Sequence, residues 1–319
     1  MINLPDINSV DVAGKRVLVR ADLDVNSVGF ENDLRIQSLL PTLDLLRSKN
    51  AQIILLGHKG RPASGEAGGV DLSLGFLQPF FDKWGAEVKE NLRLDQGEEE
   101  NNAEYAAKLA ALGEVYINEA FAASHREHAS IVGVPKLLPH AAGLRFVAEV
   151  TNLSKVFEAA KKPVVTIVGG VKEDKLTYLN PLAEISDYVL VGGALPNFIS
   201  DDSMYRVDAR FLVANLNPDK EDLTIRSIEN FEAEIAKAGT ILLTGPMGKY
   251  EEGGHLMGTK RVFEAVANSP AFKISGGGDT IKAINSLGLS EKFDWLSVGG
   301  GATLEFITKK TLPGIEALQ

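Results

Sequence analysis

The sequence predicts an α/β protein with two doubly wound, parallel-sheet domains joined by a hinge helix. Short β-branched runs alternate with segments of helical spacing along the whole chain, which is typical of parallel sheets with right-handed crossovers. At 319 residues the chain is longer than one hydrophobic core usually supports. A helical stretch without glycine, residues 146–162, separates two halves of different character. The domain join is therefore expected within residues 144–162.

The first half contains three predicted strands and two predicted helices. The runs RVLVR, QIILL and EVYIN are expected to form buried strands over residues 16–20, 52–56 and 114–118. Between the first two, Leu39, Leu43 and Leu46 recur on one face and predict a helix over residues 34–48. The alanine-rich segment 102–112 predicts a second helix.

The second half repeats one motif, an apolar strand that runs into small residues. PVVTIVGG (163–170), YVLVGGA (188–194), TILLTGPMG (240–248), FKISGGGDT (272–280) and WLSVGGGAT (295–303) all have this form. Helical spacing follows most of them, for example Leu176, Leu179, Leu182 and Ile185. In a parallel sheet these glycine loops share one edge, where backbone and helix N-termini can approach an anion. Single glycine pairs are common in turns, but the recurrence favours a phosphate or nucleotide site.

Composition excludes several classes of function. The chain has no cysteine, so disulfides, thiolate nucleophiles and cysteine-based metal centres are excluded. Its formal net charge of −10 argues against nucleic acid or an anionic membrane as partner. No apolar run is long enough to cross a bilayer, and the N-terminus does not read as a signal peptide. We therefore expect a monomeric cytoplasmic protein with small-molecule ligands.

Charged residues in the first half gather just beyond the predicted strands. They are Asp22 and Asp24 after the first strand, His58 and Arg61 after the second, Arg126 after the third, Arg35 at the start of the first long helix, and Arg93. Arginine binds phosphate and carboxylate through paired hydrogen bonds. Each arginine alone reads as a solvated surface residue, but their shared position predicts an anion site that faces the glycine-rich edge across a cleft.

Other common site motifs are missing. There is no G-x-x-x-x-G-K-[ST] loop and no G-x-G-x-x-G after a strand, so the sequence does not support P-loop or dinucleotide-binding sites. The segment His125-Arg126-Glu127-His128 lacks the spacing of H-E-x-x-H, so we do not expect it to bind a metal. No nucleophile elbow accompanies a Ser/His/Asp set.

Several stretches, in this order, resemble the phosphoglycerate kinase family along nearly the whole chain. They are GKRVLVRADLDVN, LRIQSLLPTLDLL, IILLGHKGRP, ENLRLDQGEEE, INEAFAASHREHAS, VVTIVGGVKEDKL, LTGPMGKYE, ISGGGDT, VGGGATLEF and LPGIEAL. The resemblance implies a bilobal, Rossmann-like kinase that closes around its substrates. It implies Mg²⁺-dependent, reversible phosphoryl transfer between 1,3-bisphosphoglycerate and ADP, a step of glycolysis and gluconeogenesis. Residues 1–147 with the tail 307–319 would bind phosphoglycerate, and residues 148–306 would bind ATP or ADP.

The resemblance also assigns site residues. Phosphoglycerate would be bound by Asp22, Asp24, Arg35, His58, Arg61, Arg93 and Arg126, of which the last three would hold the phosphate that is not transferred. The nucleotide would be bound by Gly170, Lys172, Lys175, Gly192, Gly193, Glu251, Gly276, Gly277, Gly278, Asp279 and Thr280. Arg35 and Lys172 would be catalytic, Asp279 would hold Mg²⁺, and Glu251 would hold the ribose.

The chain departs from the family in several places, as a shortened, divergent member. Asp24 and Thr244 stand where the family usually has asparagine, and Glu119 and Ala122 replace aspartate and glycine. Two residues rather than three separate the lysines of GGVKEDK, so the second lysine is expected to be displaced. The segment after the glycine pair of the second strand is cut back, and the family's LDIG motif is reduced to LTIR. These changes predict relaxed base selectivity.

Two alternatives remain open at this point. The chain could be a kinase-like protein that binds phosphorylated ligand as a sensor or scaffold. The shortened nucleotide-binding half and Asp24 favour this alternative. Alternatively, the same scaffold could serve a kinase for a related acyl phosphate. A coupled assay with phosphoglycerate and Mg-ATP separates the first alternative from the main reading, and substrate competition separates the second.

Overall fold

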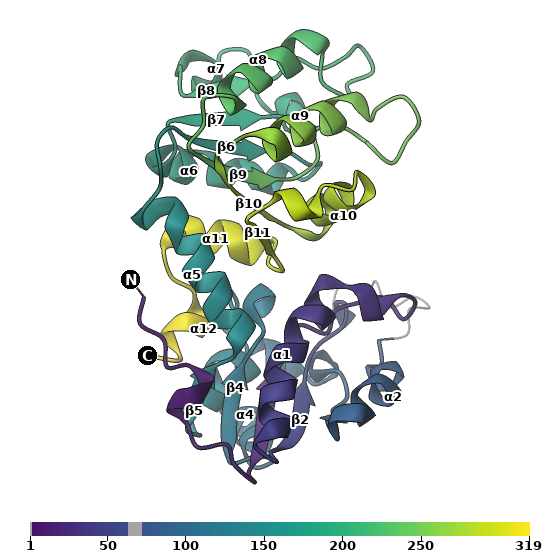
Figure 1. Ribbon diagram of the computed structural model, residues 1–319, viewed down its shortest axis with the longest axis vertical. Coiled ribbons are helices and arrows are strands. Elements are labelled where there is room, and N and C mark those ends of the chain that lie inside the picture. The colour runs from purple at the N-terminus through teal and green to yellow at the C-terminus, as the bar shows by residue number, and fades with distance from the viewer. Residues whose placement is uncertain (1, 63–71) are drawn as a thin grey trace. The chain divides into compact units, whose positions relative to one another are not determined.

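The computed structural model describes residues 2–62 and 72–319, which fold into two compact units (Figure 1). Unit 1 consists of the chain up to Thr151 together with Thr311–Gln319, and unit 2 is Asn152–Lys310. The chain passes between them within α5 (Leu144–Glu158) and again after α11 (Gly301–Lys309). None of the described helices combines the length and apolar character needed to span a membrane.

Unit 1 is built on a parallel sheet of five strands in the order β3-β2-β1-β4-β5. The strands are β1 (Arg16–Arg20), β2 (Gln52–Leu56), β3 (Glu87–Val88), β4 (Val115–Asn118) and β5 (His140–Ala142). The α-helices are α1 (Leu34–Ser48), α2 (Gln78–Phe81), α3 (Gln96–Glu99), α4 (Ala103–Ala110), the first part of α5, and α12 (Pro313–Glu316). Short helical turns connect them: η1 (Ile7–Ser9), η2 (Phe30–Asn32), η4 (Gly75–Leu77), η5 (Asp82–Trp84), η6 (Leu92–Leu94), η7 (Phe121–Ala123), η8 (Ala129–Gly133) and η9 (Val134–Lys136).

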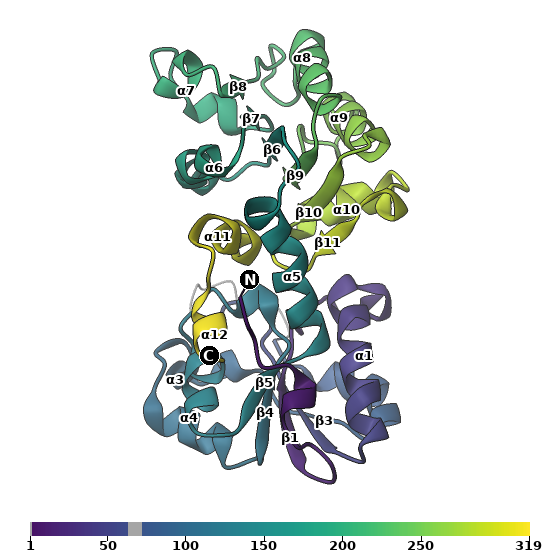
Figure 2. The same ribbon diagram turned by 60° about the vertical axis from the view of Figure 1, so that its left-hand side comes forward.

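Unit 2 is built on a parallel sheet of six strands in the order β11-β10-β9-β6-β7-β8. The strands are β6 (Val164–Val168), β7 (Tyr188–Val191), β8 (Phe211–Val213), β9 (Thr240–Thr244), β10 (Phe272–Gly276) and β11 (Trp295–Ser297). The helices are η10 (Glu173–Tyr178), α6 (Leu179–Ile185), η11 (Leu195–Phe198), α7 (Met204–Val207), α8 (Ile225–Ile235), α9 (Met257–Asn268), α10 (Gly278–Ser286), η12 (Ser290–Lys292) and α11. Figure 2 shows α6 and α11 on one side of this sheet and α8 and α9 on the other, as in a doubly wound fold.

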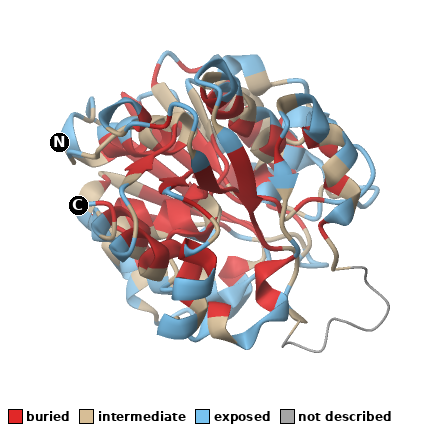
Figure 3. Cartoon of the chain, turned by 90° about the horizontal axis from the view of Figure 1, so that it is seen from below, coloured by how far each residue is buried: buried red, intermediate tan, exposed pale blue. Residues whose placement is uncertain are grey.

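The central strands of both sheets are buried because they run as apolar segments between two layers of helices. All five residues of β6 and of β9 are buried, and the strands are red over most of their length in Figure 3. Parallel strands covered on both faces require this continuous apolar character. The predicted fold class is therefore confirmed, with all the paired strands of both sheets parallel.

Candidate substrate sites of the two units

The site residues expected in unit 1 from the sequence lie at the carboxyl edge of its sheet. Arg20 is level with Leu56 on β2 and with Asn118 on β4, so the three central strands end together. Asp22 lies two residues beyond the end of β1, and His58 lies two residues beyond the end of β2. Both side chains are buried. Parallel strands thus bring residues that are far apart in sequence to one edge.

The two aspartates are held by backbone groups from other loops. The Ala122 N–H donates to Asp22 Oδ2 at 2.9 Å, and the Gly60 N–H donates to Asp24 Oδ1 at 3.0 Å. Arg35 donates to the backbone oxygen of Asp24. Burial raises the pKa of Asp22 to about 6, although the charges of Arg20 and Arg35 act in the opposite direction.

The predicted arginines gather around the same loops. Arg93 is 6% exposed; its Nη1 donates to the Gly60 oxygen at 2.6 Å and its Nε lies 3.1 Å from Glu99 Oε1. Among the described atoms, its buried Nη2 has no hydrogen-bond partner. Burial and the charge of Arg61 lower the pKa of Arg126, whereas Asp24 raises it. The structure therefore brings together all seven charged residues named from the sequence.

Sequence reasoning missed Arg20, which is fully buried beneath this edge. Its Nε donates to Ser130 Oγ at 2.8 Å and its Nη1 to the Ala21 oxygen at 2.6 Å, while its Nη2 lies 2.9 Å from His58 Nδ1. Ser130 in turn donates to the buried carboxylate of Glu98, at 2.6 Å from Oγ and 2.9 Å from N. The signal for Arg20 was a charge that directly follows the apolar residues 17–19 of β1.

His58 and His128 both have lowered pKa values, which favours the neutral imidazole. Burial and the charge of Arg20 lower the pKa of His58 well below its ordinary value. The same two causes lower the pKa of His128 to about 4. A neutral imidazole at His58 can accept or donate a hydrogen bond without adding charge to the arginine cluster.

In unit 2, three glycine loops bond directly to one another. The Gly169 N–H donates to the Thr244 oxygen at 2.7 Å, the Gly170 N–H to the Pro246 oxygen at 2.8 Å, and the Gly193 N–H to the Met247 oxygen at 3.2 Å. A Cβ at Gly193 would lie 2.4 Å from the Gly170 nitrogen, and its φ is +62°. No larger residue fits there, so the loops after β6, β7 and β9 form one continuous backbone surface.

The loops after β10 and β11 extend this surface. A Cβ at Gly276 would lie 2.8 Å from the Gly299 oxygen, and the Gly245 N–H donates to Thr280 Oγ1 at 2.7 Å. Gly277, at φ +104°, precedes α10, so the free N–H groups of the first turn of α10 open at the edge. Gly278 and Asp279 are exposed on that turn.

The two lysines of the GGVKEDK segment differ in their surroundings. Lys172 is exposed. Lys175 is half-buried, and its Nζ donates to the Gly169 oxygen at 2.7 Å. Burial lowers the pKa of Lys175 to about 8, opposed by the nearby charge of Asp279. The shorter spacing therefore leaves Lys175 at the glycine-rich edge.

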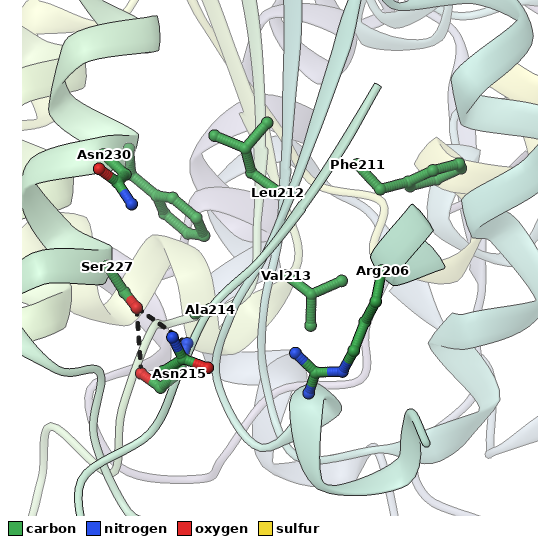
Figure 4. A pocket seen from close by; sticks show the side chains of 9 residues that line it. Arg206, Phe211, Leu212, Val213, Ala214, Asn215, Ser227 and Asn230 are labelled. Carbon is green, nitrogen blue, oxygen red and sulfur yellow. Dashed lines mark hydrogen bonds between the residues drawn. The ribbon is translucent and has the colours of Figure 1, made fainter. Parts of the chain in front are cut away.

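The second glycine pair is flanked by apolar residues from elsewhere in unit 2. A Cβ at Gly192 would lie 3.5 Å from both Leu223 Cδ2 and Phe231 Cε2, so the LTIR segment and α8 flank the second glycine pair. Glu251 lies in the β9–α9 connection and accepts a hydrogen bond of 3.2 Å from the Tyr250 hydroxyl. Burial and the charge of Glu251 raise the pKa of Tyr250, and Asp279 adds a smaller contribution. Beyond Phe231, a pocket of about 210 Å³ runs along β8 (Figure 4).

The chain matches known proteins over almost its whole length. The family model described as phosphoglycerate kinase matches residues 7–83, 85–221 and 214–310. A phosphoglycerate kinase of Haemophilus influenzae is 36% identical over 380 positions, which cover 98% of this chain and 97% of that protein. One from Dictyoglomus turgidum is 33% identical over 388 positions, covering 98% of each chain.

Solved structures agree with these relatives. Phosphoglycerate kinase from Coxiella burnetii has a TM-score of 0.81 and 28% identity, with 99% of both chains covered. The enzyme from Pyrococcus horikoshii, at 24% identity, has a TM-score of 0.84 over 99% of this chain and 98% of that one, and supports the fold alone. With a family model, curated relatives and solved structures in agreement, the chain belongs to the phosphoglycerate kinase family.

Proposed function

We propose that this kinase phosphorylates the carboxyl group of 3-phosphoglycerate from Mg-ATP and, in reverse, passes the acyl phosphate of 1,3-bisphosphoglycerate to ADP. The observation that carries the proposal is the crowding of like charge in unit 1. Burial and the charge of Arg61 lower the pKa of the half-buried Arg126, and the buried Nη2 of Arg93 has no hydrogen-bond partner within residues 2–62 and 72–319. A bound phosphate would offset the repulsion between the arginines with its negative charge, and its oxygens would accept the hydrogen bond that Arg93 Nη2 can donate.

We assign phosphoglycerate to unit 1 and the nucleotide to unit 2. In unit 1, Arg61, Arg93 and Arg126 would hold the phosphate that is not transferred. Asp22, Asp24, Arg35 and His58 would hold the glycerate portion. In unit 2, Gly170, Gly192 and Gly193 would allow the nucleotide to approach the backbone, and Glu251 would hold the ribose. Gly276, Gly277, Gly278 and Thr280 would place the phosphates at the α10 N-terminus.

The donor set also fits Mg²⁺. Asp279 is a single exposed carboxylate beside the proposed phosphate position, and Mg²⁺ in kinases is commonly held by one or two carboxylates together with substrate phosphates. Asp279 would therefore hold the ion. When bound, Mg²⁺ would neutralise charge on the phosphate oxygens.

The remaining chemistry needs only positive charge and position. Phosphoryl transfer asks for alignment of donor and acceptor and for stabilisation of charge on the equatorial oxygens. Lys172 and Arg35 would supply that charge, and the neutral His58 would position the acceptor. An acyl phosphate is reactive without a general acid, so none is assigned.

A coupled kinase assay with 3-phosphoglycerate and Mg-ATP tests the proposal. We expect turnover, and we expect Lys172→Ala to lower kcat by about 10²-fold, with little change in phosphoglycerate affinity, because its contact forms mainly in the transition state. Lys237→Ala, an exposed lysine paired with Glu234, is the matched control. Binding of phosphoglycerate without any turnover would instead support a sensor.

We further propose that the protein acts as a monomer in the cytoplasm. The absence of cysteine and the net charge of −10 support this. Light scattering of the purified protein should give the mass of one chain, 34.3 kDa.

A further inference from the structure

A cluster of charged residues ties together two connections of unit 2, outside the residues assigned above. We call it the His255 cluster; it consists of Asp219, Glu221, Lys249, Glu252 and His255. Asp219 and Glu221 follow β8, whereas the other three precede α9. The second of these connections also carries Glu251, the residue to which we assign the ribose.

The imidazole of His255 is held between two carboxylates. Its Nε2 lies 3.2 Å from Asp219 Oδ2, and its Nδ1 lies 3.5 Å from Glu221 Oε2. Asp219 is itself fixed by the Glu221 N–H, which donates to Oδ1 at 3.0 Å. Nδ1 is buried and has no hydrogen-bond partner among the described atoms. If Nε2–H donates to Asp219, Nδ1 presents a lone pair toward a carboxylate oxygen, and such a pair of acceptors is stable only with a proton or a metal ion between them.

The ligand atoms lie near the spacing that a metal ion needs. One ligand atom each from Glu221, Glu252 and His255 lies within 4.8 Å of the other two. An ion with tetrahedral bonds of about 2.0–2.2 Å would separate two ligands by about 3.3–3.6 Å, so binding would draw the three side chains together by up to about 1.5 Å. The side chain of Glu252 is 59% exposed and is free to make most of this movement.

The ligand types select the class of metal. Imidazole nitrogen with carboxylate oxygen suits zinc, cobalt and nickel, whereas Mg²⁺ prefers oxygen alone. A carboxylate that accepts from the far nitrogen of a metal-binding histidine fixes the tautomer that binding requires. We propose that Glu221, Glu252 and His255 bind one divalent transition-metal ion of the zinc class, with Asp219 orienting the imidazole.

Lys249 provides an internal competitor. Its Nζ lies 2.5 Å from Glu221 Oε1 and 3.8 Å from Glu252 Oε1. It therefore bonds the oxygen of Glu221 that faces away from His255, and it offsets part of the negative charge that would attract a metal. Removal of this ammonium group should strengthen metal binding, a result that a simple ion-pair network would not produce.

The test is a calorimetric titration of the full, metal-free chain with Ni²⁺ and with Zn²⁺, in excess Mg²⁺. We expect one ion per chain at this site. His255→Gln and Glu252→Gln should each weaken binding at least tenfold, Asp219→Asn should weaken it about tenfold, and Lys249→Met should strengthen it. The matched control is His140→Gln on β5, whose Nδ1 lies 2.9 Å from the Leu138 oxygen.

The outcomes separate this site from others on the chain. If wild type binds neither ion, or if His255→Gln and Glu252→Gln bind as wild type does, the ion is held elsewhere and the inference is wrong. A lack of response to Lys249→Met with a loss on His255→Gln would also contradict the three-ligand arrangement. None of these binding measurements depends on turnover. Their result therefore tests the metal site independently of the proposed kinase activity.

Discussion

Arg20 places a positive charge in the interior of unit 1, at the buried end of β1. Its guanidinium joins Ser130, the Ala21 carbonyl and His58, and through Ser130 it is linked to the buried Glu98. Removal of one member of such a network leaves the other charge buried without its partner, which is the costly case. The network therefore both stabilises unit 1 and holds His58 in place.

Arg20→Met should lower the free energy of unfolding of unit 1 by about 3 kcal/mol, because Glu98 would lose its compensating charge. Urea unfolding followed by the fluorescence of Trp84, in a Trp295→Phe background, measures this unit. Arg16→Met is the matched control, because Arg16 begins the same strand with its side chain 50% exposed. Equal stability of the two variants would contradict the proposed role of the network.

Lys175 should make nucleotide use dependent on pH. Its pKa is lowered to about 8, so the free enzyme loses this positive charge as the pH rises through 8. We expect kcat/KM for the nucleotide to fall between pH 7 and pH 9, since this parameter reports groups of the free enzyme. Lys175→Met should have a low kcat/KM at pH 7 and lack this fall. A fall of the same size in the variant would assign the titration to another group.

The sequence predicted site residues where polar side chains follow strands. It did not predict a polar residue that lies inside a strand. Asp22, His58 and Arg126 stand just beyond the ends of apolar runs, and a parallel sheet then brings them to one edge. Arg20 belongs to the run itself. Its neighbours Ser130 and Glu98 come from distant turns, so only the tertiary structure shows that its charge is paired.

Among the helices, α5 contributes residues to both units, because the units divide after Thr151. Glu119 lies at its first turn: Oε1 accepts from the Thr42 hydroxyl and from the Arg145 N–H at 3.0 Å, and Oε2 accepts from the Phe146 N–H at 2.9 Å. A Cβ at residue 143 would lie 2.2 Å from Glu119 Oε2, so only Gly143 leaves room for the longer acid. Glu119 thus satisfies backbone donors that the helix leaves free.

Glu119 should make unit 1 less stable at high pH. Burial raises its pKa from 4.5 to about 7, so the folded chain binds the proton more tightly than the unfolded chain does. Stability from this group is fully present below pH 4.5 and is lost as the pH rises through 7, by about 3 kcal/mol in total. Glu119→Gln should therefore narrow the difference in unfolding free energy between pH 5 and pH 8.

Urea titrations at the two pH values measure this difference. Glu104→Gln serves as control, because Glu104 is an exposed acid in the first turn of α4. If Glu119→Gln shows the same pH dependence as wild type, Glu119 is already ionised at pH 5 and the assigned shift is wrong.

Long elements were predictable and short ones were not. The strands Arg16–Arg20 and Gln52–Leu56 and the helix Leu34–Ser48 have the predicted bounds. Helical spacing over residues 176–185 is realised as the end of η10 followed by α6. Elements of two to four residues, such as β3, β8 and α7, carry too few side chains for a period to appear, and tertiary packing fixes them.

For the whole molecule, the main departure from the relatives is length. The alignments run over 380 and 388 positions, more than the 319 residues of the chain, so the relatives contain segments that this chain lacks. Between β7 and β8 the chain has only two short helices, η11 and α7, of four residues each. Phe198, Met204 and Val207 are exposed on this connection. The chain nevertheless has both parallel sheets and the glycine-rich edge of the unit 2 sheet.

This shortening should relax selectivity for the base of the nucleotide. The proposed phosphate contacts come from Lys172, Lys175 and the α10 N-terminus, none of which lies in the shortened connection. On the base side, Gly192 is flanked by Leu223 and Phe231, which offer apolar surface and no side-chain hydrogen bonds. Apolar contact alone discriminates weakly between ligands of similar shape, whereas a hydrogen-bonding site discriminates strongly.

We therefore expect kcat/KM values for ATP and GTP that agree within about tenfold, a range typical of apolar discrimination, and weaker but measurable use of tripolyphosphate. The coupled assay with each donor at saturating 3-phosphoglycerate measures the three values. Leu223→Ala should lower kcat/KM for ATP and GTP alike and leave that for tripolyphosphate unchanged, since only the base would lose a contact. A preference for ATP of a thousandfold or more would require hydrogen bonds to the base, and would show that groups other than Leu223 and Phe231 form the base site.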